Sequence, residues 1–266
     1  MFAFHDSRGP VEVAFTDRHD GVSTGPYSSL NLGVPPTGDG DPESHRVAAE
    51  ENLDLAAYAL ARGGEAWTEH PYSLPSGVRP PVTVTVRQIH GADVHTVDRA
   101  WLDAPHAEPA VADGLVTAET GVILVVRVAD CVPVLLADVQ RRLVGAAHAG
   151  RAGLVAGVVP ATVARLRELG AENLVAWVGP HVCGRCYEVP AALRDEVATA
   201  VPEAFAETSW GTPSLDVGAG VTAQLRAEGA EVVDGSRCTL EDEDLFSYRR
   251  QGAASGRLGG LVWVRP

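Results

Sequence analysis

Apolar residues along the chain form short runs separated by turn-forming residues, with amphipathic stretches between some of them. Short runs rich in valine, leucine and alanine predict strands that are covered on both faces. We predict strands at 11–16, 82–89, 94–97, 122–128, 132–137, 143–147, 174–178, 231–234 and 261–264. The runs at 82–89 and 94–97 are close enough in the sequence to pair as a hairpin.

Apolar residues at helical spacing occupy positions 154, 155, 158, 159, 163, 166 and 169, which predicts an amphipathic helix that stops at Gly170. We predict further helices at 42–61, 190–206 and 221–228. The mixture predicts an α/β or α+β domain, with a mixed β-sheet core and helices packed on the outside. No linker divides residues 1–266, so we expect one domain, with a surface insertion at the proline-rich segment 62–81.

Three residues with metal-ligand side chains stand where predicted strands end, namely His90, Cys131 and His148. Two imidazoles and one thiolate can hold a metal ion with one coordination position open. Equally, Cys131 can be a small core residue and the histidines can be hydrogen-bonded at strand ends. Spacing alone supports both interpretations to the same degree.

The formal net charge of −14 argues against a nucleic-acid partner, which normally meets a basic face. The chain contains no lysine, which excludes a Schiff base, a P-loop lysine and a lysine general base. Any bound anion must therefore be held by arginine, by backbone amides or by a metal. The glycine-rich start of the helix after His148 offers such amides.

The N-terminal residues lack the pattern of a signal peptide, and the most hydrophobic run, 121–128, is too short to span a membrane. We therefore expect a cytoplasmic protein with free thiols and no membrane partner. Cys183 and Cys186 form a lone C-x-x-C pair, which lacks half the ligands of a structural zinc site unless His181 and another residue join it. We expect ordinary thiols there and a core position for Cys238.

Several short motifs, in order along nearly the whole chain, resemble the YfiH-type laccase-domain family. Its characteristic segments match 28–33 (SSLNLG), 88–91 (QIHG), 112–114 (ADG), 129–133 (ADCVP), 148–150 (HAG), 178–180 (VGP), 186–189 (CYEV), 246–250 (FSYRR) and 255–257 (SGR). One departure is the pair Arg151 and Ala152, where the family usually has Trp-Arg.

The resemblance implies a single-domain cytosolic metalloprotein in which His90, Cys131 and His148 bind zinc. Enzymes of this family are purine nucleoside phosphorylases that also deaminate adenosine and cleave methylthioadenosine. Other members are linked to phenol oxidation with copper or to the correction of errors in peptidoglycan precursors. The ordered match favours the metal-site interpretation of the three residues.

Zinc lowers the pKa of a bound water to about 7, which suits attack on C6 of adenine. We accordingly predict Cys131, His148 and Asp130 as catalytic residues, with Asp130 or Asp113 handling a proton or the purine nitrogens. Phosphorolysis also needs a phosphate site. The candidates for substrate and phosphate binding are Asn31, Arg151, Arg249, Arg250 and Arg257.

Other functions remain open at this point. Multicopper centres commonly use His-x-His pairs, and none of the nine histidines is so arranged, but a single copper at the three-ligand site is possible. Without metal, Cys131 could act as a nucleophile and His148 as its base. A peptidoglycan-precursor editing hydrolase and a non-catalytic metal-binding protein are further alternatives. The expected assembly is a monomer or homodimer.

Overall fold

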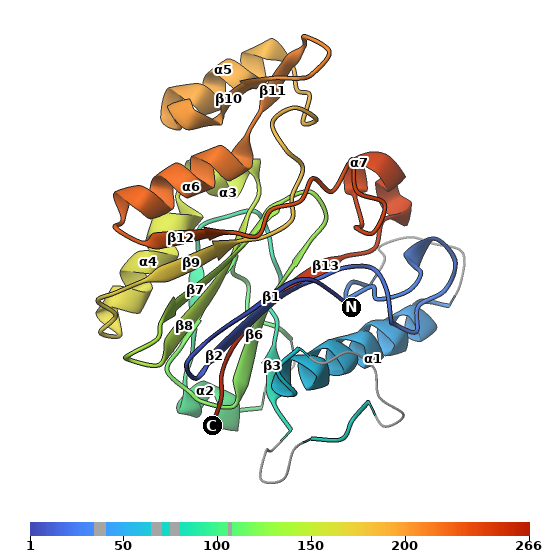
Figure 1. Ribbon diagram of the computed structural model, residues 1–266, viewed down its shortest axis with the longest axis vertical. Helices are drawn as coiled ribbons and strands as arrows, with labels where there is room; N and C mark the ends of the chain where they lie inside the picture. Colours follow the sequence, from blue (N-terminus) through green and yellow to red (C-terminus); the bar gives the residue numbers. More distant parts are fainter. Residues whose placement is uncertain (35–40, 65–70, 75–79, 106–107) are drawn as a thin grey trace.

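Two β-sheets packed face to face form the centre of the molecule, and helices cover the outer face of each sheet (Figure 1). The computed structural model describes residues 1–34, 41–64, 71–74, 80–105 and 108–266. The predicted architecture of mixed sheets with external helices is confirmed. Within the described residues, no helix is long and apolar enough to cross a membrane.

The five-stranded sheet places the last strand of the chain at its centre. Its strands, in order, are β1 (Phe2–Arg8), β2 (Val11–Thr16), β13 (Leu258–Val264), β6 (Val122–Val128) and β3 (Val82–Val84). β13 runs antiparallel to both β2 and β6. The two ends of the chain are thereby joined in one sheet.

The six-stranded sheet contains the strands that reach the candidate metal ligands. Its order is β12 (Glu231–Asp234), β9 (Val175–Val178), β7 (Val132–Asp138), β8 (Leu143–Ala149), β5 (Gly114–Thr117) and β4 (Val94–Val97). β4 pairs with β5, whereas β3 pairs with β6 in the other sheet. The predicted hairpin between 82–89 and 94–97 is therefore wrong.

The side chain of Gln88 explains why β3 is short. Gln88 donates from Nε2 to the carbonyl of Arg127 and accepts the Arg127 amide at Oε1, both at 2.8 Å. The amide of Gln88 thus takes the place of a backbone partner beside β6. The chain leaves the sheet after Val84 and is free to turn toward His90.

The continuous apolar runs occur in the central strands, such as β6, which are buried on both faces. In β6, Leu124 and Val126 lie in the core between the sheets, while Ile123 and Val125 face the core beneath α1 (Pro42–Ala61). Strands with both faces covered need no polar alternation. α1 begins as predicted, with the Asp41 side chain accepting the Ser44 amide at 3.1 Å.

The other sheet is covered on its outer face by α3 (Arg151–Ala156), α4 (Val158–Glu168) and α6 (Val217–Ala227). The predicted helix at 154–169 is thus interrupted, because Gly157 adopts φ 84° and ends α3. The predicted helix at 190–206 ends earlier, as α5 (Ala191–Ala200), and is followed by β10 (Phe205–Glu207), which pairs with β11 (Pro213–Leu215).

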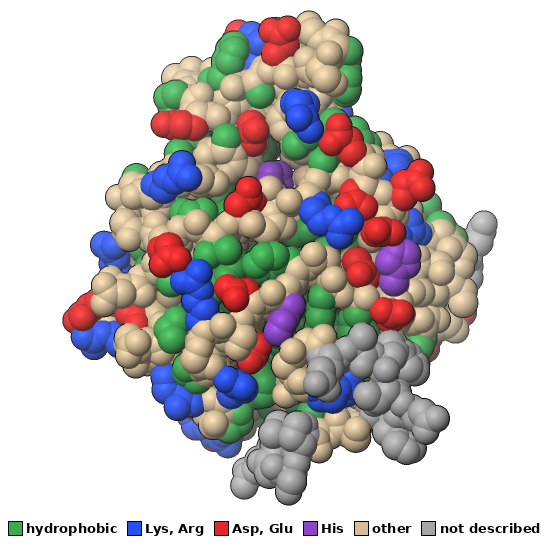
Figure 2. Space-filling model, in the orientation of Figure 1, with side chains coloured by type: hydrophobic (Ala, Val, Ile, Leu, Met, Phe, Trp, Pro, Cys, Tyr) green, Lys and Arg blue, Asp and Glu red, His purple; other side chains and the backbone are tan. Residues whose placement is uncertain are grey.

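The remaining described helices are short: α2 (Arg99–Asp103), α7 (Tyr248–Gln251) and the 3-10 turns Gly25–Tyr27, Pro202–Ala204 and Gly252–Ala254. Of the predicted surface insertion at 62–81, residues 65–70 and 75–79 lie outside the described residues, so it stays a prediction. Figure 2 shows acidic side chains interspersed with arginines over the face drawn there.

Candidate metal centre

The loop that carries His90 is shaped by one buried carboxylate. Asp113 accepts the backbone amides of Ile89, His90 and Gly91 at 3.1, 3.0 and 2.7 Å. His90 itself has φ 62°, a left-handed conformation that a non-glycine residue adopts at a cost. The three amide bonds to Asp113 hold this turn, which leaves the imidazole exposed at the surface.

The same carboxylate orients the second imidazole. His148 lies in β8, and its Nδ1 donates to Asp113 Oδ1 at 2.8 Å, while its backbone amide donates to the Asp113 carbonyl at 2.8 Å. Both side chains are buried. A hydrogen bond at Nδ1 leaves Nε2 as the ligand atom, an arrangement common for metal-bound histidine.

Cys131 completes the group at the turn between β6 and β7. Its Sγ lies 3.8 Å from His90 Nε2, and the rings of His90 and His148 are 4.7 Å apart between centroids. One ligand atom from each of the three residues lies within 4.8 Å of the others. The structure therefore brings together the three residues that the sequence predicted as metal ligands.

A missing side chain makes room for this convergence. A Cβ on Gly150 would lie 2.7 Å from His90 Cδ2 and 3.0 Å from Cys131 Sγ. Its φ of −79° is accessible to any residue, so close approach explains the glycine better than backbone geometry does. The donor set, its orientation and this space all fit a metal ion.

The ionisable groups are strongly coupled when no metal is present. Burial opposes ionisation of the Cys131 thiol, but hydrogen bonds with His148 and His90 outweigh it and lower its pKa to about 6. Burial likewise opposes the charged form of His148, yet bonds to Asp113 and Cys131 raise its pKa to about 9. The chain thus forms a thiolate and imidazolium pair, in which a metal ion can replace the proton.

Asp130 connects the centre to the C-terminal segment. Its Oδ1 accepts the hydroxyl of Thr239 at 2.7 Å, its Oδ2 accepts the amide of Arg249 at 2.6 Å, and its carbonyl accepts the amide of Val182 at 3.0 Å. Both carboxylate oxygens are therefore acceptors. Asp130 holds two distant segments against the turn that carries Cys131.

Arg257 is the arginine whose electrostatic environment includes the centre. Burial lowers its pKa, while the negative charges of Cys131 and Asp130 oppose this effect. Asn31 positions it, since Asn31 Oδ1 accepts the Arg257 amide at 2.8 Å. A Cβ on Gly33 would lie 2.5 Å from Arg257 Cγ. The segment 29–33 (SLNLG) thus positions Arg257.

The other candidate arginines differ in how their guanidinium groups are used. Arg249 is exposed, and its guanidinium lies 4.7 Å from the ring centroid of Tyr187. Arg250 donates to the carbonyls of Thr239, Leu240, Asp242 and Leu245, and so ties up that loop. Arg151 is the first residue of α3, directly after Gly150. α3 has six residues, so its dipole is short.

Two features were not predicted. The sequence marked Asp113 for proton handling, but its bonds to the His90 loop and to His148 identify it as the organising residue of the centre. The described residues also contain a second group of possible metal ligands, Cys183, Cys186, Cys238 and Glu241. The sequence did not reveal this group, because Cys183 and Cys186 are far from Cys238 along the chain.

Residues 73–265 match the family model described as multi-copper polyphenol oxidoreductase laccase. The chain belongs to this laccase-domain family. Solved structures agree on the fold: YlmD from Geobacillus stearothermophilus has a TM-score of 0.78 at 29% identity, covering 100% of this chain and 99% of that one. A Neisseria meningitidis protein has a TM-score of 0.76 at 29% identity, covering 98% and 96%.

Curated relatives in this laccase-domain family carry the name purine nucleoside phosphorylase. One from Streptomyces coelicolor is 49% identical over 99% of this chain and 100% of its own length. Another, from Streptomyces griseus, is 48% identical over 96% and 95%, respectively. A Corynebacterium glutamicum relative of the same name is 40% identical over 96% and 95%.

Proposed function

We propose that this protein is a purine nucleoside phosphorylase that cleaves adenosine, inosine and methylthioadenosine, and that it also deaminates adenosine. The observation that carries the proposal is the 49% identity to the Streptomyces coelicolor purine nucleoside phosphorylase over 99% of this chain. A similarity of this extent spans both the metal centre and the arginine-bearing segments. A cytoplasmic location and a monomeric or homodimeric state belong to the same proposal and rest on the sequence.

His90, Cys131 and His148 are the residues that would hold zinc. Two imidazoles and one thiolate suit this ion and leave a fourth position open. Bound there, zinc would supply Lewis acidity and lower the pKa of a water molecule to about 7. Asp113 keeps His148 in the tautomer that presents Nε2.

Phosphorolysis requires an anion site beside the nucleoside. A phosphate oxygen attacks C1′ of the ribose, the C1′–N9 bond breaks, and its electron pair leaves with the purine, which takes up a proton. In the proposal, Arg257, Arg249 and Arg151 hold the phosphate. Asp130 and Asn31 position Arg249 and Arg257 through their backbone amides. Arg250 stabilises the loop at 239–245.

Deamination uses water in place of phosphate. The exocyclic amino group of adenosine leaves as ammonia and the oxygen of water remains on C6, which gives inosine. Asp130, the neighbour of Cys131, is the residue proposed to hold or pass the proton. The two activities therefore differ in one measurable respect, because only cleavage of the glycosidic bond depends on phosphate.

The test is product analysis of purified protein of known metal content with adenosine, inosine and methylthioadenosine, each with and without phosphate. We expect free base and ribose 1-phosphate, or its methylthio analogue, only when phosphate is present, and inosine from adenosine in its absence. His90→Ala removes one ligand and should abolish both product sets. His19→Ala is the matched control, since His19 is exposed and pairs with Asp244 at the surface.

Intact wild-type protein with stoichiometric metal that leaves all three nucleosides unchanged would overturn the proposal. Two further substrates then decide between the alternatives. A phenol offered with oxygen to the copper-loaded protein tests the activity in the description of the matching family model. A peptidoglycan precursor tests editing, with release of an amino acid as the signal.

A further inference from the structure

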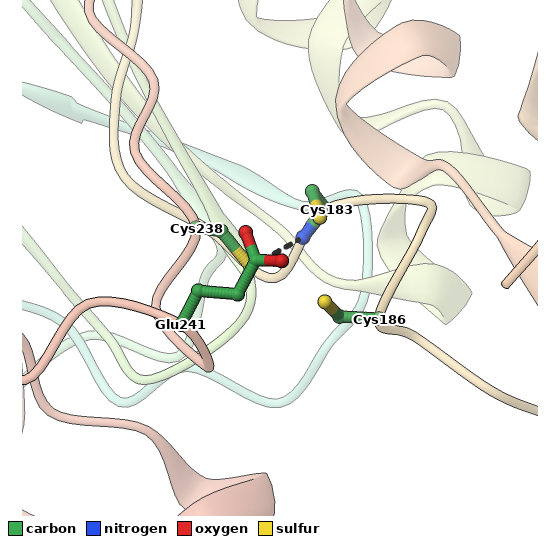
Figure 3. A group of neighbouring side chains, drawn as sticks. All are labelled: Cys183, Cys186, Cys238 and Glu241. Atoms are coloured by element: carbon green, nitrogen blue, oxygen red, sulfur yellow. Dashed lines mark hydrogen bonds between the residues drawn. The ribbon is translucent and has the colours of Figure 1, made fainter. Parts of the chain in front are cut away.

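A second group of ligand-type side chains lies beside the metal centre but outside it. The sulfur atoms of Cys183, Cys186 and Cys238 and a carboxylate oxygen of Glu241 all lie within 4.8 Å of one another. Figure 3 shows the three cysteines and the glutamate converging from two separate stretches of chain. We propose that these four residues bind a structural zinc ion.

The backbone fixes the two stretches side by side. β9 and β12 are parallel neighbours, and the chain beyond them continues the pairing through a bridge between His181 and Cys238. The amide of His181 donates to the Arg237 carbonyl at 3.1 Å, and the Thr239 amide donates to the His181 carbonyl at 3.0 Å. The thiol of Cys238 is thus delivered next to Cys183 by strand pairing, whatever the ligand.

The C-x-x-C segment folds as a tight turn that gathers its own two thiols. The amides of Cys186 and Tyr187 both donate to the Cys183 carbonyl, at 2.9 and 3.0 Å. The amide of Cys183 points at the sulfur of Cys238 at 3.5 Å, the dashed line in Figure 3. A backbone N–H group is thus aimed at one of the sulfur atoms of the cluster.

The donors match the preferences of zinc. Tetrahedral zinc with Zn–S bonds near 2.3 Å places its sulfur ligands about 3.8 Å apart, which is compatible with the observed upper limit of 4.8 Å. Three thiolates and one carboxylate close the coordination shell, so the site offers no position for a substrate. Binding releases the thiol protons to the solvent.

The negative charge of such a site has a neighbour that offsets it. Four anionic donors around Zn²⁺ leave two negative charges. The guanidinium of Arg185, within the C-x-x-C turn, lies 3.6 Å from the Glu241 carboxylate. Both groups are more than half exposed, so this pair contributes little to stability, but it keeps a cation beside the donors.

The position of the cluster indicates what the ion would do. Val182, which precedes Cys183, donates to the carbonyl of Asp130, and Thr239, which follows Cys238, donates to its carboxylate. Asp130 in turn is the neighbour of Cys131. A zinc ion at the cluster would therefore hold together the two segments that bind Asp130. It would thereby help to position the turn that carries Cys131.

Metal content measured under reducing conditions tests the inference without reference to activity. We expect two zinc ions per wild-type chain, one in Cys186→Ser with Cys238→Ser, one in His90→Ala with Cys131→Ser, and none in the combined variant. Cobalt gives a second readout, because thiolate-to-cobalt charge-transfer absorption should come mainly from the cluster, with three sulfurs against one. A single zinc in the wild type that disappears with His90→Ala and Cys131→Ser would refute the second site.

Two controls keep the inference testable if the serine variants fold poorly. Glu241→Gln changes an exposed residue, and we expect it to release one zinc to a chelator at least tenfold more readily than the wild type. In the His90→Ala, Cys131→Ser background, zinc added to metal-free protein should raise the unfolding temperature, because binding favours the folded state. No shift in the unfolding temperature would overturn the inference. A wild-type mass lower by two hydrogens, with no metal at the cluster, would also overturn it, because it would show a disulfide.

Discussion

Asp113 shows how one residue can organise the candidate metal centre without being one of the three candidate ligands. Its carboxylate accepts three amides of the His90 loop together with Nδ1 of His148. It therefore fixes the main chain at one ligand and the tautomer of another. The carboxylate is fully buried, so these bonds act in an environment where an unsatisfied acceptor would be costly.

Gly150→Ala tests whether the space beside the ligands is needed. The added methyl group would press on His90 and Cys131, and we expect zinc affinity to fall by about 10- to 100-fold, the range typical of changes that displace a ligand. Competition with a coloured chelator measures this. Gly91→Ala is the control, because its Cβ would meet its nearest neighbours, which include Asp113 Oδ2, at an ordinary 3.6 Å. Equal affinity in both variants would contradict the steric argument.

The candidate ligand set could be predicted at the scale of residues, whereas its support could not. His90, Cys131 and His148 each follow or end an apolar run next to small residues, a signal that is local in sequence. The role of Asp113 depends on the β5 and β8 pairing, which sets His148 beside it across 35 positions. The group around Cys238 likewise exists only once β9 and β12 are paired.

At the scale of elements, apolar runs located strands well but could not assign their partners. β2, β4, β6 and β12 have the predicted bounds, as does α1. The predicted hairpin is absent because β3 and β4 pair with strands of different sheets, and the long helix is interrupted because Gly157 takes a left-handed conformation. Both outcomes depend on the tertiary environment. Periodicity is insensitive to them.

Asp138, at the end of β7, should make a contribution to the stability of the protein that depends on pH. Its buried carboxylate accepts the amides of Arg141, Glu172 and Asn173 at 3.0, 2.7 and 3.0 Å. Burial raises the pKa of this group, but the three amide bonds outweigh it, so the folded pKa is lowered. The stabilisation is therefore present above the unfolded pKa of about 3.9 and is lost as the pH falls through the folded value.

Asp138→Asn should reduce the free energy of unfolding by about 1–3 kcal/mol at pH 7, since the amide group cannot accept all three bonds. Urea unfolding of both proteins from pH 7 down to pH 3 should show the difference narrowing below about pH 4. Asp103→Asn on the exposed end of α2 serves as the control, with little effect at any pH. A difference that stays constant across the range would show that the charge of Asp138 is not responsible.

At the scale of the whole molecule, the topology brings both ends of the chain to the candidate metal centre. β2 and β13 are neighbours, so the segment after β2, with Asn31, meets the segment before β13, with Arg257. β6 lies on the other side of β13 and leads directly to Cys131. The order of strands in one sheet thus brings Arg257 within electrostatic reach of Cys131, which is 126 positions away in the sequence.

Gly179, which follows β9, lies against the other sheet, since a Cβ there would lie 2.4 Å from the ring of Phe15 in β2. Gly179→Ala should therefore cost about 1–3 kcal/mol of stability by overpacking. Combined with Phe15→Leu, which frees space, the loss should be smaller than the sum of the single losses by about 0.5–3 kcal/mol. Phe15→Leu with Leu225→Ala should be additive, because Leu225 packs in the separate core beneath α6. Additive losses in the first pair as well would mean that the sheets can separate freely, and that their spacing does not depend on this contact.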